Sequence, residues 1–120
     1  MITVYGITIC STVQKARNWL EANKIEYNFH DYKKLGIDEV YLKSWCAKFG
    51  WDKVLNMQGM MWRKASEEEK AKVVDQKSAI DFMIKVPNSI KRPIVEIESG
   101  EILRGFDEGE WKQSFAGLNK

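Results

Sequence analysis

The hydrophobic positions of the chain repeat with two different periods, and these periods predict the order of its elements. Residues 2–5 form a short β-rich run, and residues 25–32 alternate apolar and polar side chains with the period of two that is typical of a strand. Between them, Val13, Ala16 and Leu20 are spaced to share one face of a helix. The chain therefore opens as strand, helix and strand, an order typical of a right-handed parallel crossover.

The middle of the chain, residues 38–86, has a mostly helical pattern. From Asp38, apolar side chains recur three and four residues apart up to Gly50, which predicts a helix whose buried stripe consists of Leu42, Trp45, Cys46 and Phe49. Residues 52–86 are predicted to be helical but interrupted at Gly59. Within them, Ser66 is expected to cap one helix and Ser78 to begin another.

An apolar cluster interrupts this helical stretch and consists of Met57, Met60, Met61 and Trp62. We expect the cluster to pack between helices, because methionine fills irregular core space well. The alternative is a hydrophobic rim beside a functional site.

The last third of the chain returns to strands. Residues 91–98 predict a strand opened by Pro93, and residues 101–104 predict the returning strand of a hairpin after the turn at Ser99–Gly100. Asp107 is placed to cap a final helix. The complete pattern predicts one α/β domain over residues 1–120 with a helical insertion.

Composition and charge exclude several classes of protein. The 19 basic residues are balanced by 17 acidic ones, so that the net charge of +2 does not indicate a nucleic-acid-binding surface. No apolar run approaches the roughly 20 residues of a membrane span, and no secretory signal opens the chain. With two cysteines and one histidine, no metal site is expected. These features predict a soluble cytoplasmic protein with no membrane or nucleic-acid partner.

Cys10 is the candidate for chemistry because it lies where a loop meets the first predicted helix. The unpaired N–H groups and the dipole of a helix start favour a thiolate over a thiol. Ser11 or Thr12 is expected to cap this helix and could also donate a hydrogen bond to the thiolate. The other cysteine, Cys46, lies on an apolar helical stripe and is expected to be buried and inert. His30 is expected to be solvated.

Several motifs in this order resemble a known family. They are Cys10 followed by Ser11-Thr12-Val13-Gln14-Lys15-Ala16-Arg17, then Asp81-Phe82-Met83, Arg92-Pro93-Ile94-Val95 and Leu103-Arg104. Together they resemble the arsenate reductase-like family of the thioredoxin superfamily, the ArsC/Spx/YffB group, over essentially the full length. The resemblance implies a thioredoxin-like mixed four-stranded sheet flanked by helices, with the helical insertion between strands two and three.

The same resemblance implies roles for individual residues. Cys10 matches the nucleophile of the family, and Arg92 and Arg104 match arginines that bind an oxyanion or stabilise the thiolate. Pro93 matches a proline that is usually in the cis form in this fold.

Three departures distinguish the chain from the arsenate reductases of that family. Residues 54–59 lack the arginine found in the insertion of those enzymes, and Arg63 cannot be equated with it. Gly6 stands where they have a histidine shortly before the cysteine. Val13 stands where the regulatory branch usually completes Cys-x-x-Cys. The chain is therefore most similar to the YffB-like branch with a single thiol, whose members are described as glutathione-dependent thiol reductases.

The resemblance and the residues together predict a thiol reductase in which Cys10 attacks an oxidised substrate. With no resolving cysteine beside it, the mixed disulfide would be released by glutathione or a small dithiol protein. Glutathione is then a co-substrate, and no bound cofactor is expected. The alternative is a regulatory or docking protein of the Spx type that binds RNA polymerase without catalysis. Arsenate reduction is expected to be weak or absent.

Overall fold

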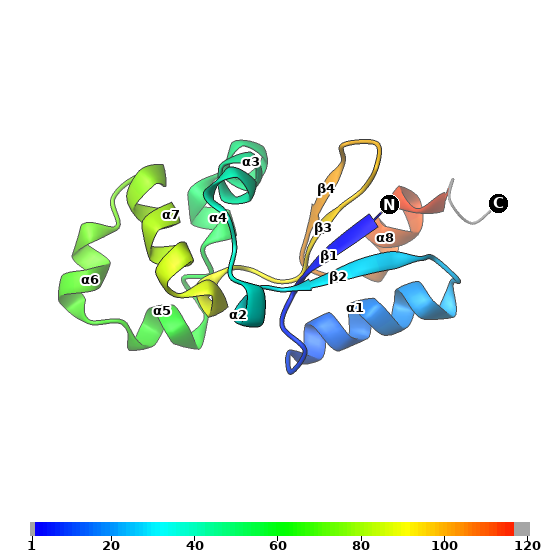
Figure 1. The fold of residues 1–120 in the computed structure, drawn as a ribbon, viewed down its shortest axis with the longest axis horizontal. Coiled ribbons are helices and arrows are strands. Elements are labelled where there is room, and N and C mark those ends of the chain that lie inside the picture. Colours follow the sequence, from blue (N-terminus) through cyan, green and yellow to red (C-terminus); the bar gives the residue numbers. More distant parts are fainter. Residues whose placement is uncertain (1, 117–120) are drawn as a thin grey trace. The chain divides into compact units, whose positions relative to one another are not determined.

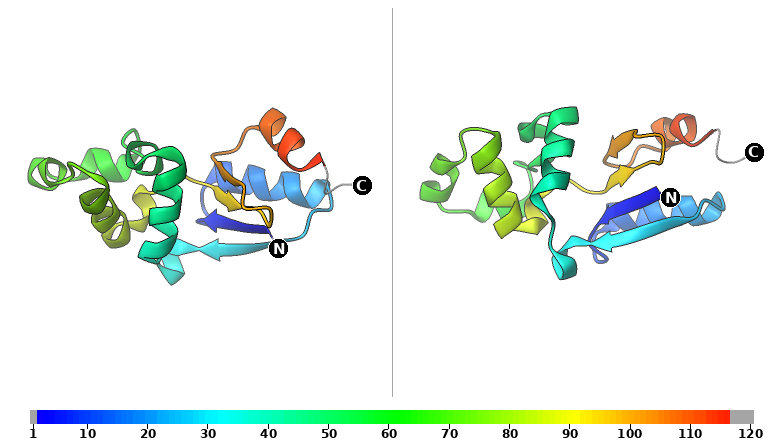
Figure 2. Two further views of the ribbon diagram at one scale, coloured as in Figure 1. Left: turned by 90° about the horizontal axis from the view of Figure 1, so that it is seen from above. Right: turned by 45° about the horizontal axis from the view of Figure 1, so that its top comes forward.

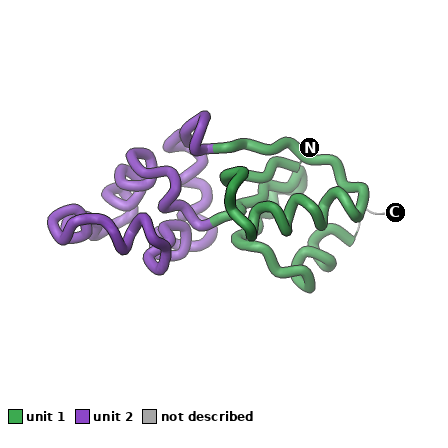
Figure 3. The backbone as a smooth tube through the Cα atoms, turned by 90° about the horizontal axis from the view of Figure 1, so that it is seen from below, with its two compact units in different colours: residues 1–31, 92–120 green, residues 32–91 purple. Residues whose placement is uncertain are grey.

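The chain forms two compact units in the computed structural model, which describes residues 2–116 (Figure 3). The sheet unit comprises the residues up to Asp31 together with those from Arg92 onward, and the helical unit comprises Tyr32–Lys91. The organisation of the chain as a single domain stays a prediction.

The sheet unit contains a mixed four-stranded sheet with the strand order β2-β1-β3-β4 (Figure 1). Strand β1 pairs in parallel with β2 and antiparallel with β3, which pairs antiparallel with β4. The elements of this unit are β1 (Ile2–Gly6), α1 (Ser11–Ala22), β2 (Tyr27–Asp31), β3 (Ile94–Glu96), β4 (Ile102–Arg104) and α8 (Glu108–Ser114). This arrangement confirms the predicted thioredoxin-like fold class.

The core of the sheet unit lies on one face of the sheet, where α1 and α8 both pack. The predicted α1 stripe is confirmed, since Val13, Ala16 and Leu20 are fully buried. From α8, Trp111 is also fully buried, and its ring contacts that of Phe106 with centroids 4.8 Å apart. The remaining buried members of this core are Ile2, Val4, Ile25, Val95, Ile97, Leu103 and Phe115.

The helical unit follows β2 in sequence and precedes β3 (Figure 2). Its elements are α2 (Tyr32–Leu35), α3 (Glu39–Phe49), α4 (Trp51–Val54), α5 (Met60–Lys64), α6 (Glu67–Lys72), α7 (Gln76–Lys85) and the 3₁₀ helix η1 (Pro87–Ser89). None of the helices in residues 2–116 combines the length and the apolar character that crossing a membrane requires.

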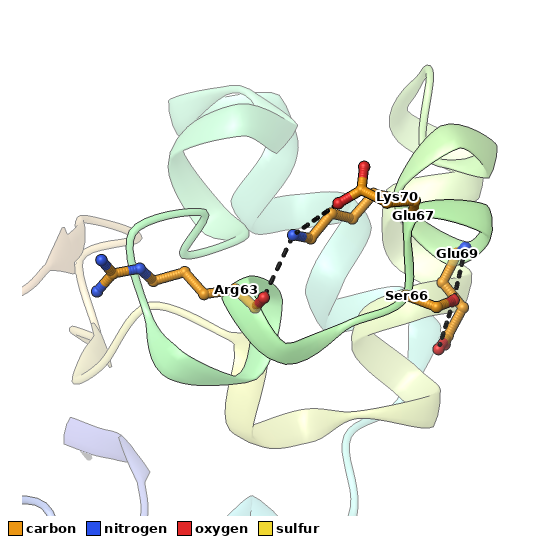
Figure 4. Close-up of polar contacts among 5 residues, drawn as sticks. All are labelled: Arg63, Ser66, Glu67, Glu69 and Lys70. Carbon is orange, nitrogen blue, oxygen red and sulfur yellow. Dashed lines mark hydrogen bonds and ion pairs between the residues drawn. The ribbon is translucent and has the colours of Figure 1, made fainter.

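Side-chain caps define where several of these helices begin. Ser66 caps α6 as predicted, because its hydroxyl oxygen accepts a hydrogen bond from the N–H of Glu69 at 3.1 Å (Figure 4). In the same region the ammonium group of Lys70 contacts the carbonyl oxygen of Arg63 at 3.3 Å and the carboxylate of Glu67 at 3.8 Å. These contacts join the end of α5 to the first turn of α6.

Helix α7 begins earlier than the sequence predicted. Asp75 is its N-cap, and the carboxylate accepts a hydrogen bond from the N–H of Ser78 at 2.9 Å. The Ser78 hydroxyl in turn accepts from the N–H of Asp75 at 3.1 Å, which completes a reciprocal capping box. Ser78 therefore marks the first turn of the helix rather than its start.

The methionine cluster does not pack between helices of its own unit, so that prediction is wrong. Met60 is 65% exposed, Met57 and Met61 are also exposed, and α5 contributes no buried residue. Trp62 alone of the cluster is partly buried, with its ring 5.4 Å from that of Phe82. Trp62 is therefore the member of the cluster that turns inward, while Met60 and Met61 on the same short helix stay exposed, as does Met57 before it.

Candidate active site

The site begins with a close approach between β1 and α1. A Cβ atom on Gly6 would lie 2.8 Å from Cγ2 of Val13, a distance that real side chains do not tolerate. Glycine at this position lets the first turn of α1 pack directly on the end of β1. No side chain fits there, including the histidine that the arsenate reductases carry according to the resemblance.

Cys10 is the N-cap residue of α1, with extended backbone angles and a carbonyl oxygen that accepts from the N–H of Gln14 at 3.0 Å. The prediction that Ser11 or Thr12 caps this helix is wrong, because both lie inside its first turn. The amide side chain of Gln14 also donates to the carbonyl oxygen of Thr8 at 3.0 Å. This bond ties the loop before Cys10 to the helix after it.

The surroundings of Cys10 lower its pKa below the ordinary value of a thiol. Partial burial is the largest single influence and opposes ionisation, but hydrogen bonds to the sulfur together outweigh it. The N–H of Val13 contributes most, followed by the side chain of Arg92 and the N–H of Thr12, and the positive charge of Arg92 adds to them. The neutral thiol of Cys10 does not accept a capping hydrogen bond in the structure. The N–H groups of Val13 and Thr12 therefore stabilise chiefly the charged form of the sulfur.

The segment that opens β3 brings Arg92 to the sulfur. The Arg92–Pro93 peptide bond is cis, as the resemblance implies, and Pro93 is buried. The carbonyl oxygen of Pro93 accepts a hydrogen bond from the N–H of Gly105 at 2.8 Å, which ties this segment to the residue that follows β4. This hydrogen bond fixes the backbone beside Arg92 at the end of the sheet.

Arg104 ends β4 on the sheet face shared with Tyr5. It pairs with Ile94, which in turn pairs with Tyr5 across the sheet. Arg104 is not among the groups that lower the pKa of Cys10. Its role in binding an anion therefore stays a prediction.

The structure separates the parts played by the residues of the first helical turn. Thr12 acts on the sulfur through its main-chain N–H and not through its hydroxyl, while Ser11 is exposed and is not among the groups that lower the pKa. The sequence analysis missed Val13 as a site residue. Val13 is the third residue after the cap, and the N–H at that position commonly donates to a capping side chain. Recognising Cys10 as the cap would therefore have identified Val13 as a site residue.

Cys46 lies in the helical unit and is 4% exposed, which confirms its predicted burial. Burial raises the pKa of the Cys46 thiol to about 11. His30 is not fully solvated as predicted, since it is half-buried and its ring lies 5.2 Å from that of Tyr5. Of the two cysteines, Cys10 is the one whose surroundings favour the thiolate, which is the nucleophilic form.

The ArsC family model matches residues 5–114 of this chain, which include Cys10, Arg92, Pro93 and Arg104. The chain belongs to the ArsC family. Two solved structures of proteins with similar sequences also superpose on this chain. The YFFB protein is 42% identical and superposes with a TM-score of 0.87 over 100% of both chains. An arsenate reductase (ArsC) related protein from Brucella melitensis is 38% identical, with a TM-score of 0.72 over 95% of this chain and 93% of that one.

Curated relatives of this ArsC-family chain include one uncharacterised protein and several transcriptional regulators. A protein of Haemophilus influenzae is 40% identical over 97% of this chain and 100% of its own length. The global transcriptional regulator Spx of Listeria innocua is 25% identical over 92% of this chain and 83% of its own length. The family thus contains arsenate reductase-related proteins and transcriptional regulators on one fold, and fold alone does not decide between them.

Proposed function

We propose that this protein is a glutathione-dependent thiol reductase that uses Cys10 as its nucleophile. The observation that carries the proposal is the lowered pKa of Cys10, which the N-terminal N–H groups of α1 and the side chain of Arg92 produce together. A thiolate is the reactive form in disulfide exchange, and a docking protein would have no need of one.

The proposed cycle has two exchange steps. The Cys10 thiolate attacks one sulfur of a disulfide formed between a substrate thiol and glutathione. A new bond forms between Cys10 and the glutathione sulfur, the old disulfide bond breaks, and the substrate leaves as a thiolate that takes up a proton. A second glutathione thiolate then attacks the glutathione sulfur, which releases glutathione disulfide and restores the Cys10 thiolate.

An external thiol fits this cycle better than Cys46 does. A resolving cysteine must ionise and reach the mixed disulfide, whereas Cys46 is buried and its pKa is raised to about 11. A small dithiol protein could replace the second glutathione with the same balance of bonds.

Arsenate is a poorer candidate for the substrate. The contact of Gly6 with Val13 excludes a side chain at the position of the reductase histidine. Residues 54–59 carry no arginine for an oxyanion. We therefore expect arsenate reduction to be weak or absent.

The test is reduction of a glutathionylated peptide by glutathione, followed through the glutathione disulfide that accumulates. We expect Cys10→Ser to abolish the catalysed rate and Cys46→Ser to leave it largely intact. A wild-type rate no greater than the rate with glutathione alone would overturn the proposal. Loss of turnover in Cys46→Ser, with the fold preserved, would instead make Cys46 the resolving thiol.

The second candidate is a regulator of the Spx type, and the similarity to Spx of Listeria innocua is the observation that favours it. Such a protein would bind RNA polymerase without turnover. Binding of purified polymerase that survives Cys10→Ser, together with no catalysed disulfide reduction by the wild type, would support this candidate over the reductase.

A further inference from the structure

Two neighbouring hollows lie along α1, one beside the edge of the sheet and one beside the loop that precedes Cys10. One hollow of about 500 Å³ is lined by Arg17, Glu21 and residues 25–29. A second hollow of about 210 Å³ is lined by Thr8, Gln14 and Asn18, and it shares Arg17 and Glu21 with the first. We call the two together the α1 groove. Since Thr8 lies two residues before Cys10 in the sequence, the groove leads toward the nucleophile.

Arg17 forms the fixed centre of the groove. Its guanidinium lies over the ring of Phe29, 4.0 Å from the centroid, and its Nε donates to the hydroxyl of Tyr27 at 3.0 Å. These two contacts fix the orientation of the Arg17 guanidinium over the ring of Phe29. Within residues 2–116 Arg17 makes no ion pair, so its terminal N–H donors can serve the carbonyl oxygens of a bound chain.

Two carboxylates give the groove its charge. Glu21 and Glu26 are both exposed, and neither forms an ion pair within the part of the chain that the structure describes. With Arg17, the lining carries a formal charge of −1. A cationic side chain with an aliphatic stem suits this combination, because the partly exposed rings of Tyr27 and Phe29 offer apolar surface beside the two carboxylates.

The outer wall of the groove is an edge strand. Among the strands that the structure describes, β2 lies at the edge of the sheet beside β1, and its residues Tyr27–Asp31 contain neither lysine nor proline, the residues that commonly protect an edge. At an edge strand, an extended peptide can align through its main chain.

We propose that the α1 groove binds an extended segment of a disulfide-bearing protein, with a lysine or arginine of that segment placed between Glu21 and Glu26. The role as a substrate track rests on the proposed reductase function, whereas peptide binding itself does not. Along α1 the distance from Cys10 to Glu21 is about 16 Å at 1.5 Å per helical residue. An extended peptide spans that distance in about five residues, which sets the expected separation between the reacting cysteine and the basic side chain.

Direct binding tests the groove without any chemistry. The probes are fluorescein-labelled twelve-residue peptides that are neutral apart from one test position, with serine in place of cysteine and with lysine about five residues before or after the serine. Matched probes carry glutamate at the same position. By fluorescence anisotropy we expect the better lysine peptide to bind about tenfold more tightly than its glutamate counterpart.

Variants of the full chain locate the binding. The double variant Glu21→Gln/Glu26→Gln should lose the preference for lysine, while Glu110→Gln, an exposed glutamate of α8 outside the groove, should keep it. Thermal melting of each variant checks that the fold is retained. Equal binding of the lysine and glutamate peptides to the wild type, or a preference that survives the double variant, would overturn the proposal.

Kinetics separate this proposal from the proposed function. The same peptides with a glutathionylated cysteine should show the lysine preference in kcat/KM with the wild type and lose it with the double variant, while bis(2-hydroxyethyl) disulfide should be reduced equally by the wild type and Glu110→Gln. If disulfides are reduced without any peptide preference, the groove proposal fails and the reductase stands. If the peptides bind with the preference but no disulfide is reduced, the reductase fails and the groove remains a docking site.

Discussion

The side chain of Arg92 donates a hydrogen bond to the sulfur of Cys10 and places a positive charge beside it. The two residues come from opposite ends of the chain, since one precedes β3 and the other caps α1. The pairing of β1 with β3 brings these segments to the same end of the sheet. Reactivity at Cys10 therefore depends on sheet topology as well as on the helix that follows it.

Removing the charge of Arg92 should make Cys10 less reactive at neutral pH. In Arg92→Met the thiolate loses a hydrogen bond and a positive charge, so the pKa of Cys10 should rise and the pH profile of alkylation should move to higher pH. At pH 7 we expect alkylation to slow by about threefold to tenfold. The control is Arg63→Met, an exposed arginine of the helical unit. An unchanged profile for Arg92→Met would assign the lowered pKa to the helix start alone.

Gly6→Ala should destabilise the protein because the added methyl group meets Val13 at 2.8 Å. The β-branched side chain of Val13 cannot easily rotate away, so the first turn of α1 must shift, at a cost of about 1 to 3 kcal/mol. Urea unfolding measures the loss, and alkylation should report a shifted pH profile for Cys10.

Gly109→Ala is the matched control for this substitution. The new Cβ would lie 3.4 Å from Oδ1 of Asp107, an ordinary contact, and alanine favours the helix by about 0.5 to 1 kcal/mol. If Gly6→Ala were as stable as Gly109→Ala, the close approach of β1 to α1 would not be a requirement of the fold.

Cys46 should make the fold less stable at alkaline pH. Burial keeps its thiol neutral in the folded state up to a pKa of about 11, while the exposed thiol of the unfolded chain ionises at its lower, ordinary pKa. The unfolded chain thus binds fewer protons in that window, and stability falls as pH rises through it, by about 2 to 3 kcal/mol in total. Urea unfolding at pH 8 and pH 11 should show a smaller loss in Cys46→Ala, whose side chain cannot titrate. Equal losses would mean that the Cys46 thiol is accessible to water.

Arg17 and Tyr27 should be energetically coupled. Their hydrogen bond at 3.0 Å and the stacking of Arg17 over Phe29 join α1 to β2. We expect Arg17→Met and Tyr27→Phe each to cost about 1 kcal/mol, and the double variant to cost less than their sum. Urea unfolding of the four proteins completes the cycle, and additive losses would show that the contact contributes nothing to stability.

Periodic patterns predicted the elements well, but not their boundaries. The alternation over residues 25–32 identified β2, whose ladder covers only Tyr27–Asp31, because Ile25 enters the core from the preceding turn. The strand predicted over residues 91–98 is likewise longer than the observed strand β3, which covers Ile94–Glu96. Proline has no N–H to donate to a ladder, so the strand begins only after Pro93.

Caps and clusters were harder to predict because several residues of the right type stood side by side. Cys10 takes the cap position in place of Ser11 or Thr12, since the close packing of Gly6 on Val13 fixes where the helix begins. Met60 and Met61 are exposed on the short helix α5, which turns Trp62 inward instead, and Met57 is exposed before that helix. Composition gave no means to distinguish these outcomes.

The sequence by itself determined which residues could do chemistry and the order of elements that carries them. The local pattern of strand, loop and helix is enough to place Cys10 at a helix start, because helix periodicity is a property of neighbouring residues. Only the tertiary structure decided which charge meets the sulfur. The sequence offered both Arg92 and Arg104, with Arg92 favoured for its place beside Pro93, and in the structure Arg92 meets Cys10 while Arg104 is not among the groups that lower its pKa. The physical reason is that electrostatic stabilisation depends on distance in space, which strand pairing sets and sequence separation does not.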